Sequence, residues 1–305
     1  MKKARAEGLS RSILDRLKAK AVERQQSFSE ILELYAIERF LYRLSKSRYR
    51  DRFVLKGALL LRHWIGMEAR PTRDIDLSGF GQIEMAEAKT ILRELWRLQV
   101  VDDGIELDPT SLEVRSIRPE SPVAGLRANF VAHIGKVRLR YQIDIGLDDA
   151  VIPSATDMAP DSILGLPVMP IKTVTPYTVV AEKIEAMVVL GSANSRMKDY
   201  FDLYALSRNL AFDGMVLKDA VRATFHKRRT PFPDGVPDGL SESFADEPAN
   251  SLRWNAFIHR QWPGEKKKDL IGVIRELCVF VLPILQAAGT DMDFLMNWPP
   301  GGPWQ

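Results

Sequence analysis

Apolar residues in the first half of the chain recur at helical spacing in some segments and alternate at strand spacing in others. The segments with helical spacing are residues 10–25, 27–44 and 84–98. The segments predicted as strands are residues 72–79, 111–117, 126–134 and 137–146, the last two joined by a turn at Gly135–Lys136. Ser27 and Glu30 fit an S-x-x-E capping box, and residues 51–66 predict an approach segment, a turn at Gly57 and a helix. The first half is therefore predicted to be α/β, with a helical arm at its N-terminus.

The second half of the chain is predominantly helical in its spacing. Residues 147–175 carry several prolines and no clear periodicity, which indicates a crossover between domains. Thr175–Pro176 is typical of a helix start. The segments predicted as helices are residues 177–190, 199–209, 213–226, 251–261 and 267–288, with a long loop at 228–250 and a Pro/Gly-rich tail at 297–305. The predicted fold class is α+β: an α/β domain over residues 1–150 and a mainly α-helical domain over residues 151–305.

Composition restricts the class of protein. The 305 residues are 46% hydrophobic and 27% charged, as in folded soluble proteins rather than disordered ones. The single cysteine, Cys278, excludes a disulfide framework or a thiolate zinc site within the chain and fits the reducing cytoplasm. The charged N-terminus is followed by no apolar run, which argues against a secretory signal. Residues 277–289 are shorter than the roughly 20 residues of a membrane span, so we expect a buried helix in a cytoplasmic protein.

Charge adds two candidate surfaces for nucleic acid. The net charge of +3 is too small to imply such a partner, but residues 1–50 hold 13 basic against 6 acidic residues. This segment is either a basic arm that contacts phosphates or a solvated helix surface. Residues 226–229 are likewise either a contact for RNA backbone or a solvated helix end. The four histidines show no metal-ligand spacing.

Three aspartates on two predicted strands are the strongest chemical signal. Asp74 and Asp76 share one face of their strand because strand side chains alternate, and Asp144 lies on the polar face of the strand at 137–146. Converging carboxylates suit Mg²⁺ or Mn²⁺, and metals held in this way typically serve a phosphate substrate. The plainer alternative is an exposed strand with solvated charges. The turn at Gly57–Ala58 before a helix favours the first interpretation, because backbone N–H groups there can hold a polyphosphate.

The order of these elements resembles the polymerase-beta-type nucleotidyltransferase superfamily and, more narrowly, the AbiEii/AbiGii toxins, which include the mycobacterial MenT toxins. Members show K-G-[small], a helix and then R-x-[ST]-x-D-[ILV]-D, followed by a lysine motif and an aspartate motif. The matching residues are Lys56, Gly57, Ala58, Arg70, Thr72, Asp74, Asp76, Lys183, Lys198, Asp199 and Asp202. The resemblance runs from about residue 10 to at least residue 210. Ala58 stands where the superfamily often has serine, which implies weaker nucleotide binding or compensation by Lys56 or Arg73.

The resemblance implies a polymerase-beta-like domain with a mixed sheet, followed by a helical domain that completes the nucleotide cleft. It implies a toxin that transfers NMP from an NTP to RNA, with the tRNA 3′ end as the best-supported acceptor, and releases pyrophosphate. Asp74, Asp76 and Asp144 would hold two Mg²⁺ or Mn²⁺ ions, with Asp144 also helping to deprotonate the attacking hydroxyl. Lys183 would bind the triphosphate. The nucleotide-binding residues implied are Lys56, Gly57, Ala58, Arg73, Lys183 and Asp199.

Several alternatives stay open from the sequence. Lys183 fits an exposed helix lysine paired with Glu182 or Glu185, and Asp199 would bind the ribose, orient Lys183 or cap its own helix. A cognate antitoxin is implied, acting with or without direct contact. The chain also fits a non-catalytic module that binds RNA or a partner, or a kinase-like enzyme that phosphorylates a protein.

Overall fold

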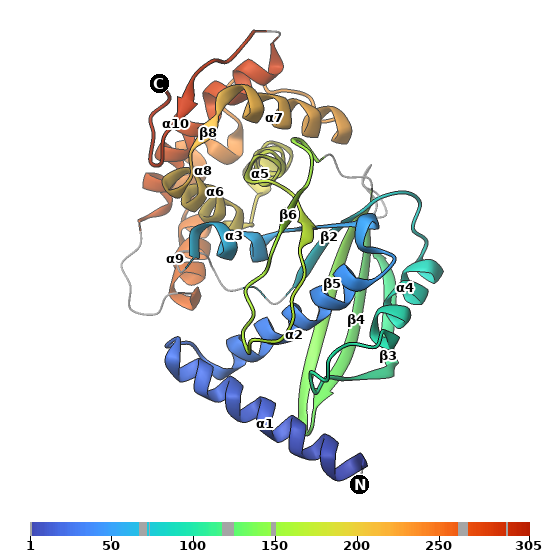
Figure 1. The fold of residues 1–305 in the computed structure, drawn as a ribbon. Helices are drawn as coiled ribbons and strands as arrows, with labels where there is room; N and C mark the ends of the chain where they lie inside the picture. Colours follow the sequence, from blue (N-terminus) through green and yellow to red (C-terminus); the bar gives the residue numbers. More distant parts are fainter. Residues whose placement is uncertain are drawn as a thin grey trace. The chain divides into compact units, whose positions relative to one another are not determined.

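The protein is described from a computed structural model, in which it divides into two compact units (Figure 1). The residues that the structure describes are 2–66, 72, 74–117, 125–147, 151–261, 268–290 and 292–305. Unit 1 comprises Met1–Gly57, Thr72–Asp149 and Thr156–Thr173. Unit 2 comprises Ala58–Pro71, Ala150–Ala155 and Val174–Gln305. Each unit therefore draws on separate segments of the chain.

Unit 1 is a mixed sheet with helices, as the predicted fold class requires. Its described helices are α1 (Lys2–Glu23), α2 (Phe28–Lys46), the short 3-10 turn η1 (Arg50–Arg52) and α4 (Met85–Arg97). Its strands are β1 (Phe53–Lys56), β2 (Ile75–Gly79), β3 (Glu106–Ile117), β4 (Gly125–Ile134), β5 (Val137–Leu147), β6 (Thr156–Met158) and β7 (Ile171–Thr173). Their spatial order is β3-β4-β5-β2-β1-β7-β6, with β2 parallel to β5, β1 parallel to β7 and the other pairs antiparallel.

One face of this sheet forms the core of unit 1. Phe130 of β4 and Tyr141 of β5 are stacked, with ring centroids 4.7 Å apart. Phe40 of α2 and Trp96 of α4 both pack on this pair, at centroid distances of 5.5–6.4 Å. Because strand side chains alternate, burying these rings directs the intervening polar residues of β4 and β5 to the other face.

Short sequence motifs determine where α2 begins and where the β4–β5 hairpin turns. The Ser27 hydroxyl accepts a hydrogen bond from the Glu30 backbone N–H at 3.2 Å, and the Glu30 carboxylate accepts one from the Ser27 N–H at 3.0 Å. The predicted capping box is therefore confirmed. Gly135 has a φ of 56° in the two-residue turn, which pairs Ile134 with Val137. This turn fixes the register of every pair along the hairpin.

Unit 2 is helical apart from one small sheet. Its described helical elements are α3 (Ala58–Ile65), α5 (Pro176–Leu190), η3 (Gly191–Ala193), α6 (Met197–Asn209), α7 (Gly214–Arg228), η4 (Asp238–Leu240), α8 (Glu242–Asp246), α9 (Pro248–Gln261) and α10 (Leu270–Gly289). The small sheet pairs β8 (Phe212–Asp213) with β9 (Asn297–Trp298). Thr175 and Pro176 occupy the predicted N-cap and first helical position of α5. Helix α10 packs against α6, α7 and α8.

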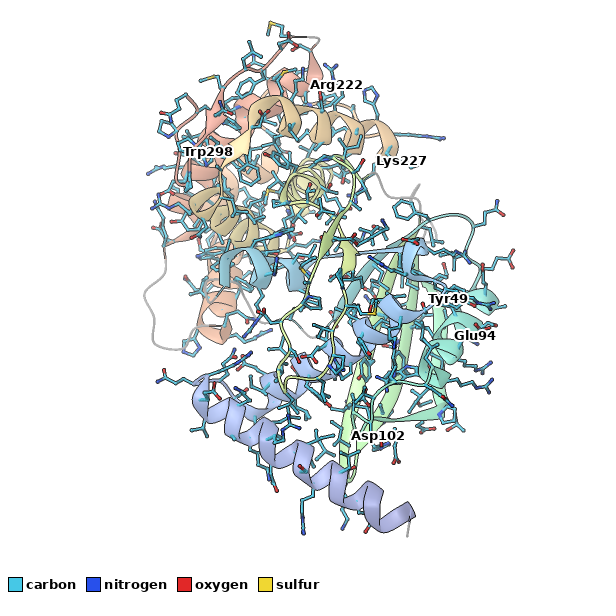
Figure 2. The ribbon with its side chains drawn as sticks, in the orientation of Figure 1. Tyr49, Glu94, Asp102, Arg222, Lys227 and Trp298 are labelled. Carbon is cyan, nitrogen blue, oxygen red and sulfur yellow. The ribbon has the colours of Figure 1, made fainter. Side chains whose placement is uncertain are left out.

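Three segments predicted as irregular contain regular structure. The proline-containing crossover at 147–175 includes β6 and β7, which pair with each other and, through β7, with β1. The predicted loop at 228–250 includes η4, α8 and the start of α9. The Pro/Gly-rich tail is anchored by two tryptophans: Trp298 (Figure 2) donates its indole N–H to the Ser207 carbonyl at 2.7 Å, and Trp304 donates to the Phe280 carbonyl at 3.0 Å.

Helix α10 is, within the described residues, long and apolar enough by length and composition to cross a membrane. Half of its apolar window is buried inside the protein. Phe280 of this helix packs on Trp298 and Trp304, at centroid distances of 4.7 Å and 5.8 Å. These contacts are those of a core helix, as the sequence predicted.

The aromatic cluster of unit 1 gives a direct test of its core. We expect Phe130→Ala to lower the free energy of unfolding by about 3–5 kcal/mol, because it leaves a cavity among three aromatic rings. Urea unfolding followed by tryptophan fluorescence measures this loss. Val22→Ala is the matched control, since Val22 is 81% exposed and its substitution should change stability by less than about 0.5 kcal/mol. Equal stability of the two variants would contradict the assigned core.

Candidate active site

Four charged residues form a row across the polar face of the unit 1 sheet. The strand registers pair Lys56 with Asp76, Asp76 with Asp144, and Asp144 with Arg127. Directly paired residues point to the same face of a sheet, so the row reads plus, minus, minus, plus across β1, β2, β5 and β4. Asp74, two residues before Asp76, is exposed at the start of β2. The expected approach of Asp144 to the D-x-D strand thus follows from the parallel pairing of β2 with β5.

Arg127 is the charged partner that the sequence interpretation missed. It donates from Nε to Oδ1 of Asp144 at 2.7 Å and from Nη2 to Oδ2 at 2.6 Å. Hydrogen bonding to Asp144 raises the pKa of the Arg127 guanidinium, and the charges of Asp144, Asp74 and Asp76 add to this effect against the opposing effect of burial. All three candidate carboxylates therefore act on one arginine, which stays charged.

The backbone of Gly57 lies directly against Asp76. A Cβ on Gly57 would lie 2.1 Å from Oδ2 of Asp76, and Gly57 has a φ of 80°, in the left-handed region that favours glycine. Both constraints apply at the residue that precedes α3. The predicted turn at Gly57 is confirmed, and glycine is required there because a carboxylate approaches the chain.

The chemistry of this row fits a hard divalent cation in part. Asp74 and Asp76 offer the carboxylate oxygens that Mg²⁺ and Mn²⁺ prefer. Asp144 instead has both of its oxygens hydrogen-bonded to Arg127. Among the described residues, no three His, Cys, Asp or Glu side chains are grouped closely enough to hold a metal ion. The three-carboxylate metal site stays a prediction.

Unit 2 contains a second cluster of one cation and two carboxylates. Nζ of Lys183 in α5 lies 2.7 Å from Oδ1 of Asp199 and 2.8 Å from Oδ2 of Asp202, both in α6. Burial opposes the charged lysine, but the two aspartates outweigh it and raise its pKa. Burial also opposes the charged form of Asp199, which would raise its pKa. Lys183 outweighs burial, and the pKa of the Asp199 carboxyl is lowered. Lys183 and Asp199 are therefore ionised at neutral pH.

This cluster decides between the alternatives left open for its members. Lys183 pairs with Asp199 and Asp202, whereas Glu185 binds Arg228 and Thr230. The interpretation of Lys183 as an exposed lysine paired with Glu182 or Glu185 was therefore wrong.

Asp199 holds the lysine, as one alternative stated. It does not cap α6, since the N-cap position is Arg196 and Asp199 lies in the first turn. A contact of Lys183 or Asp199 with nucleotide stays a prediction.

The structure describes one of three further residues of the family motif. Ala58 begins α3, which packs against α6 within unit 2. Arg70 and Arg73 lie outside the described residues, so their predicted roles are not addressed by the structure.

The two basic segments are partly used in internal ion pairs. In the first fifty residues, Arg39 and Arg43 are buried and pair with Glu38 and Asp103. Neither a solvated surface nor a phosphate-binding arm describes these two residues. Near the end of α7, Arg228 lies 2.7 Å from Glu185 and 3.3 Å from Glu182, so it supports unit 2 internally. Lys227 is exposed at the same helix end (Figure 2).

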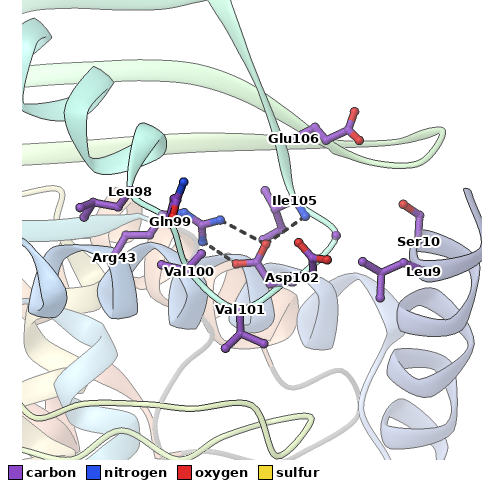
Figure 3. A pocket seen from close by; sticks show the side chains of 12 residues that line it. Leu9, Ser10, Arg43, Leu98, Gln99, Val100, Val101, Asp102, Ile105 and Glu106 are labelled. Atoms are coloured by element: carbon purple, nitrogen blue, oxygen red, sulfur yellow. Dashed lines mark hydrogen bonds and ion pairs between the residues drawn. The ribbon is translucent and has the colours of Figure 1, made fainter. Parts of the chain in front are cut away.

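A cavity of about 750 Å³ lies in another part of unit 1, between α1 and the loop that follows α4. Figure 3 shows Asp102 and Glu106 at its edge, with Arg43 alongside. Arg43 is paired there with Asp103 in two hydrogen bonds and stacks over the Trp96 ring at 4.6 Å. Arg43 and Asp103 thus pair with each other, and the cavity contains none of the candidate site residues.

One family model and several solved structures are similar to this chain. A family model described as "Nucleotidyl transferase AbiEii toxin, Type IV TA system" matches residues 39–272. No curated protein matches the chain. The crystal structure of JHP933 from Helicobacter pylori is similar at 14% identity and a TM-score of 0.48, covering 86% of this chain and 93% of that one. An antigenic nucleotidyltransferase-like protein from Paracoccidioides brasiliensis is similar at 14% identity and a TM-score of 0.38, covering 80% and 92%.

The contact between Gly57 and Asp76 predicts a strong effect of a single methyl group. Gly57→Ala should displace the Asp76 carboxylate and strain the backbone, lowering the free energy of unfolding by about 1–3 kcal/mol. Urea unfolding measures the loss, with Gly8→Ala as control, because a Cβ there meets nothing within 4 Å and alanine favours the helix. A neutral Gly57→Ala substitution would refute the close approach.

The buried cluster in unit 2 predicts how the free energy of unfolding depends on pH. The contribution of Asp199, whose pKa is lowered, is complete above its ordinary value of about 3.9 and is lost as pH falls through the folded value. The contribution of Lys183, whose pKa is raised, is complete below about 10.4 and is lost as pH rises through the folded value. Wild-type stability from this cluster should therefore be constant between about pH 5 and pH 9.

Removing the Lys183 cation should make the free energy of unfolding depend on pH between pH 5 and pH 7. We expect Lys183→Met to cost about 3–5 kcal/mol at pH 7, because two buried carboxylates lose their partner. The loss should shrink at pH 5, because acid favours the neutral form of a carboxyl group that has lost its buried cation. Urea unfolding at both pH values measures the change, with the exposed Lys136→Met as control. A Lys183→Met loss that is equal at pH 5 and pH 7 would contradict the assignment.

Proposed function

The chain belongs to the AbiEii family of nucleotidyl transferase toxins of type IV toxin–antitoxin systems, and we propose that it transfers NMP from an NTP to the 3′ end of tRNA. The matched residues, 39–272, include the charged row on the sheet and the Lys183 cluster. Membership implies nucleotide substrates and a cognate antitoxin. The observation that carries the finer proposal is the strand register that places Asp76 directly beside Asp144, with Asp74 two residues before Asp76.

In the proposed reaction, the oxygen of the acceptor hydroxyl forms a bond to the α-phosphorus of the NTP. At the same time the bond between the α-phosphorus and the oxygen that bridges to the β-phosphate breaks. Pyrophosphate leaves with the electron pair of the broken bond. Asp74 and Asp76 are the residues that would hold Mg²⁺ or Mn²⁺, which when bound neutralises charge on the triphosphate. Gly57 leaves room for the Asp76 carboxylate beside the backbone.

Asp144 is our candidate to receive the proton of the attacking hydroxyl. Each carboxylate oxygen has a second lone pair beyond the one that meets Arg127, so the pair leaves Asp144 able to accept a further hydrogen bond. Arg127 cannot serve as the base, because its pKa is raised and it stays protonated. Lys183 stays our candidate for a triphosphate-binding cation, since Asp199 and Asp202 keep it charged.

The acceptor is proposed from charge and family rather than from a defined RNA surface. His226, Lys227 and Arg229 are exposed at the end of α7. Exposed basic groups would give RNA binding that weakens steeply with salt. Cytoplasmic action follows from such an acceptor, because tRNA resides there.

Labelling distinguishes this proposal from the other reactions. Purified protein, Mg²⁺ and total tRNA are incubated with each of four α-³²P NTPs, and in parallel with γ-³²P NTPs, and RNA and protein are resolved on one gel. We expect α-label in RNA with one or more NTPs, and a loss of more than about 100-fold for Asp76→Asn.

The matched control is Asp102→Asn, an exposed aspartate in the same unit and distant from the row, which should keep wild-type labelling. Label transferred from the γ-position to protein would identify a kinase instead. Absence of label in both RNA and protein would refute nucleotidyl transfer and favour a binding module.

A further inference from the structure

We propose that Arg127 takes the place of a second metal ion in this site. In this scheme one divalent ion is held by Asp74 and Asp76, and Arg127 stays paired with Asp144 throughout the reaction. The inference rests on the proposed function and specifies the cations that serve it. It differs from the two-metal arrangement in which Asp144 is itself a metal ligand.

The pairing of Arg127 with Asp144 is built into the sheet. The two residues are direct partners in the β4–β5 hairpin, whose register runs without a break from Ile134–Val137 to Gly125–Gly146. The planar guanidinium meets both carboxylate oxygens at 2.7 Å and 2.6 Å, a bidentate geometry that a compact ammonium group cannot reproduce. The ten register pairs of the hairpin fix the Arg127 and Asp144 backbone positions opposite each other.

Partial burial makes the pair costly to separate. The side chains of Arg127 and Asp144 are 29% and 21% exposed. A metal ion that replaced Arg127 at Asp144 would leave the guanidinium beside it, where two cations would repel each other. With Arg127 and Lys56, one divalent ion already offsets the three carboxylates Asp74, Asp76 and Asp144, and a second divalent ion would leave a large excess of positive charge before nucleotide binds.

Arg127 also has the chemistry to act on the substrate. Two of its five N–H donors meet Asp144, and the guanidinium presents the others in the same plane. Arginine binds phosphate oxygens as readily as it binds carboxylates. Arg127 would thus orient Asp144 and stabilise negative charge that develops on the α-phosphate or on the attacking oxygen, which is the role of the second cation.

Counting bound metal separates the two arrangements. The full chain is dialysed against Mn²⁺ with each of the four α,β-methylene ribonucleoside triphosphates, and bound Mn²⁺ is quantified by electron paramagnetic resonance. We expect one Mn²⁺ per chain in wild type and in Asp144→Asn, and a loss of at least about tenfold in Mn²⁺ affinity in Asp76→Asn. Circular dichroism and urea unfolding establish that each variant is folded.

The arginine is tested by activity alongside the metal count. We expect Arg127→Gln to lower the rate of label transfer by about 100-fold while Mn²⁺ still binds. Arg127→Lys should recover part of this loss, because it restores charge without the bidentate fork. Arg140→Gln is the matched control: Arg140 is exposed on β5, four residues from Asp144, and its substitution should leave both measurements unchanged.

The outcomes separate this inference from the proposed function. Two Mn²⁺ in wild type, of which Asp144→Asn loses one, would overturn the role of Arg127 and leave nucleotidyl transfer standing. Full activity of Arg127→Gln would also overturn it. One Mn²⁺ in wild type and in Asp144→Asn, without any transfer of label, would support the single-metal site and refute the proposed reaction. A wild-type chain that binds no Mn²⁺ would refute both.

Discussion

The parallel pairing of β2 with β5 places Asp76 directly beside Asp144. Neighbouring strands lie about 4.8 Å apart, so this register holds two negative charges side by side on one face of the sheet. Like charges at paired positions destabilise a sheet unless other charges offset them. Here Arg127 on β4 pairs with Asp144, and Lys56 on β1 is the register partner of Asp76. The order of the adjacent strands β1, β2, β5 and β4 therefore places a cation beside each of the two aspartates.

The same balance recurs in unit 2 under stronger burial. Lys183 is 13% exposed and touches two aspartates one turn apart on α6. A buried carboxylate without a partner loses much of its hydration energy, so each ion here depends on the other two. The cluster therefore joins α5 to α6 by two ion pairs. In both units carboxylates that lie close together are accompanied by cations at fixed positions in the fold.

Most contacts that the sequence predicted are local, although it also indicated the approach of Asp144 to the D-x-D strand and Asp199 as a residue that orients Lys183. Other contacts between distant segments were missed. The capping box at Ser27 and the turn at Gly135 depend on neighbouring residues, and both were predicted. The turn also implies that Arg127 opposes Asp144, but this pair is visible only when the register is counted across the hairpin. The partners of Lys183 lie 16 and 19 residues away on another helix. Trp298 and Trp304 bind carbonyl groups 91 and 24 residues away, which no spacing in a Pro/Gly-rich tail indicates.

A fixed arginine and a bound metal ion supply positive charge in different ways. A metal ion must be taken from solution and its affinity depends on the ionisation and freedom of its ligands. Arg127 is positioned when the hairpin folds, and its raised pKa keeps it charged at any pH at which the protein is folded. Its charge therefore requires no reorganisation when negative charge develops during transfer, which is the condition under which electrostatic stabilisation is most effective. The cost of holding Asp76 beside Asp144 is then offset within the folded sheet, before any substrate binds.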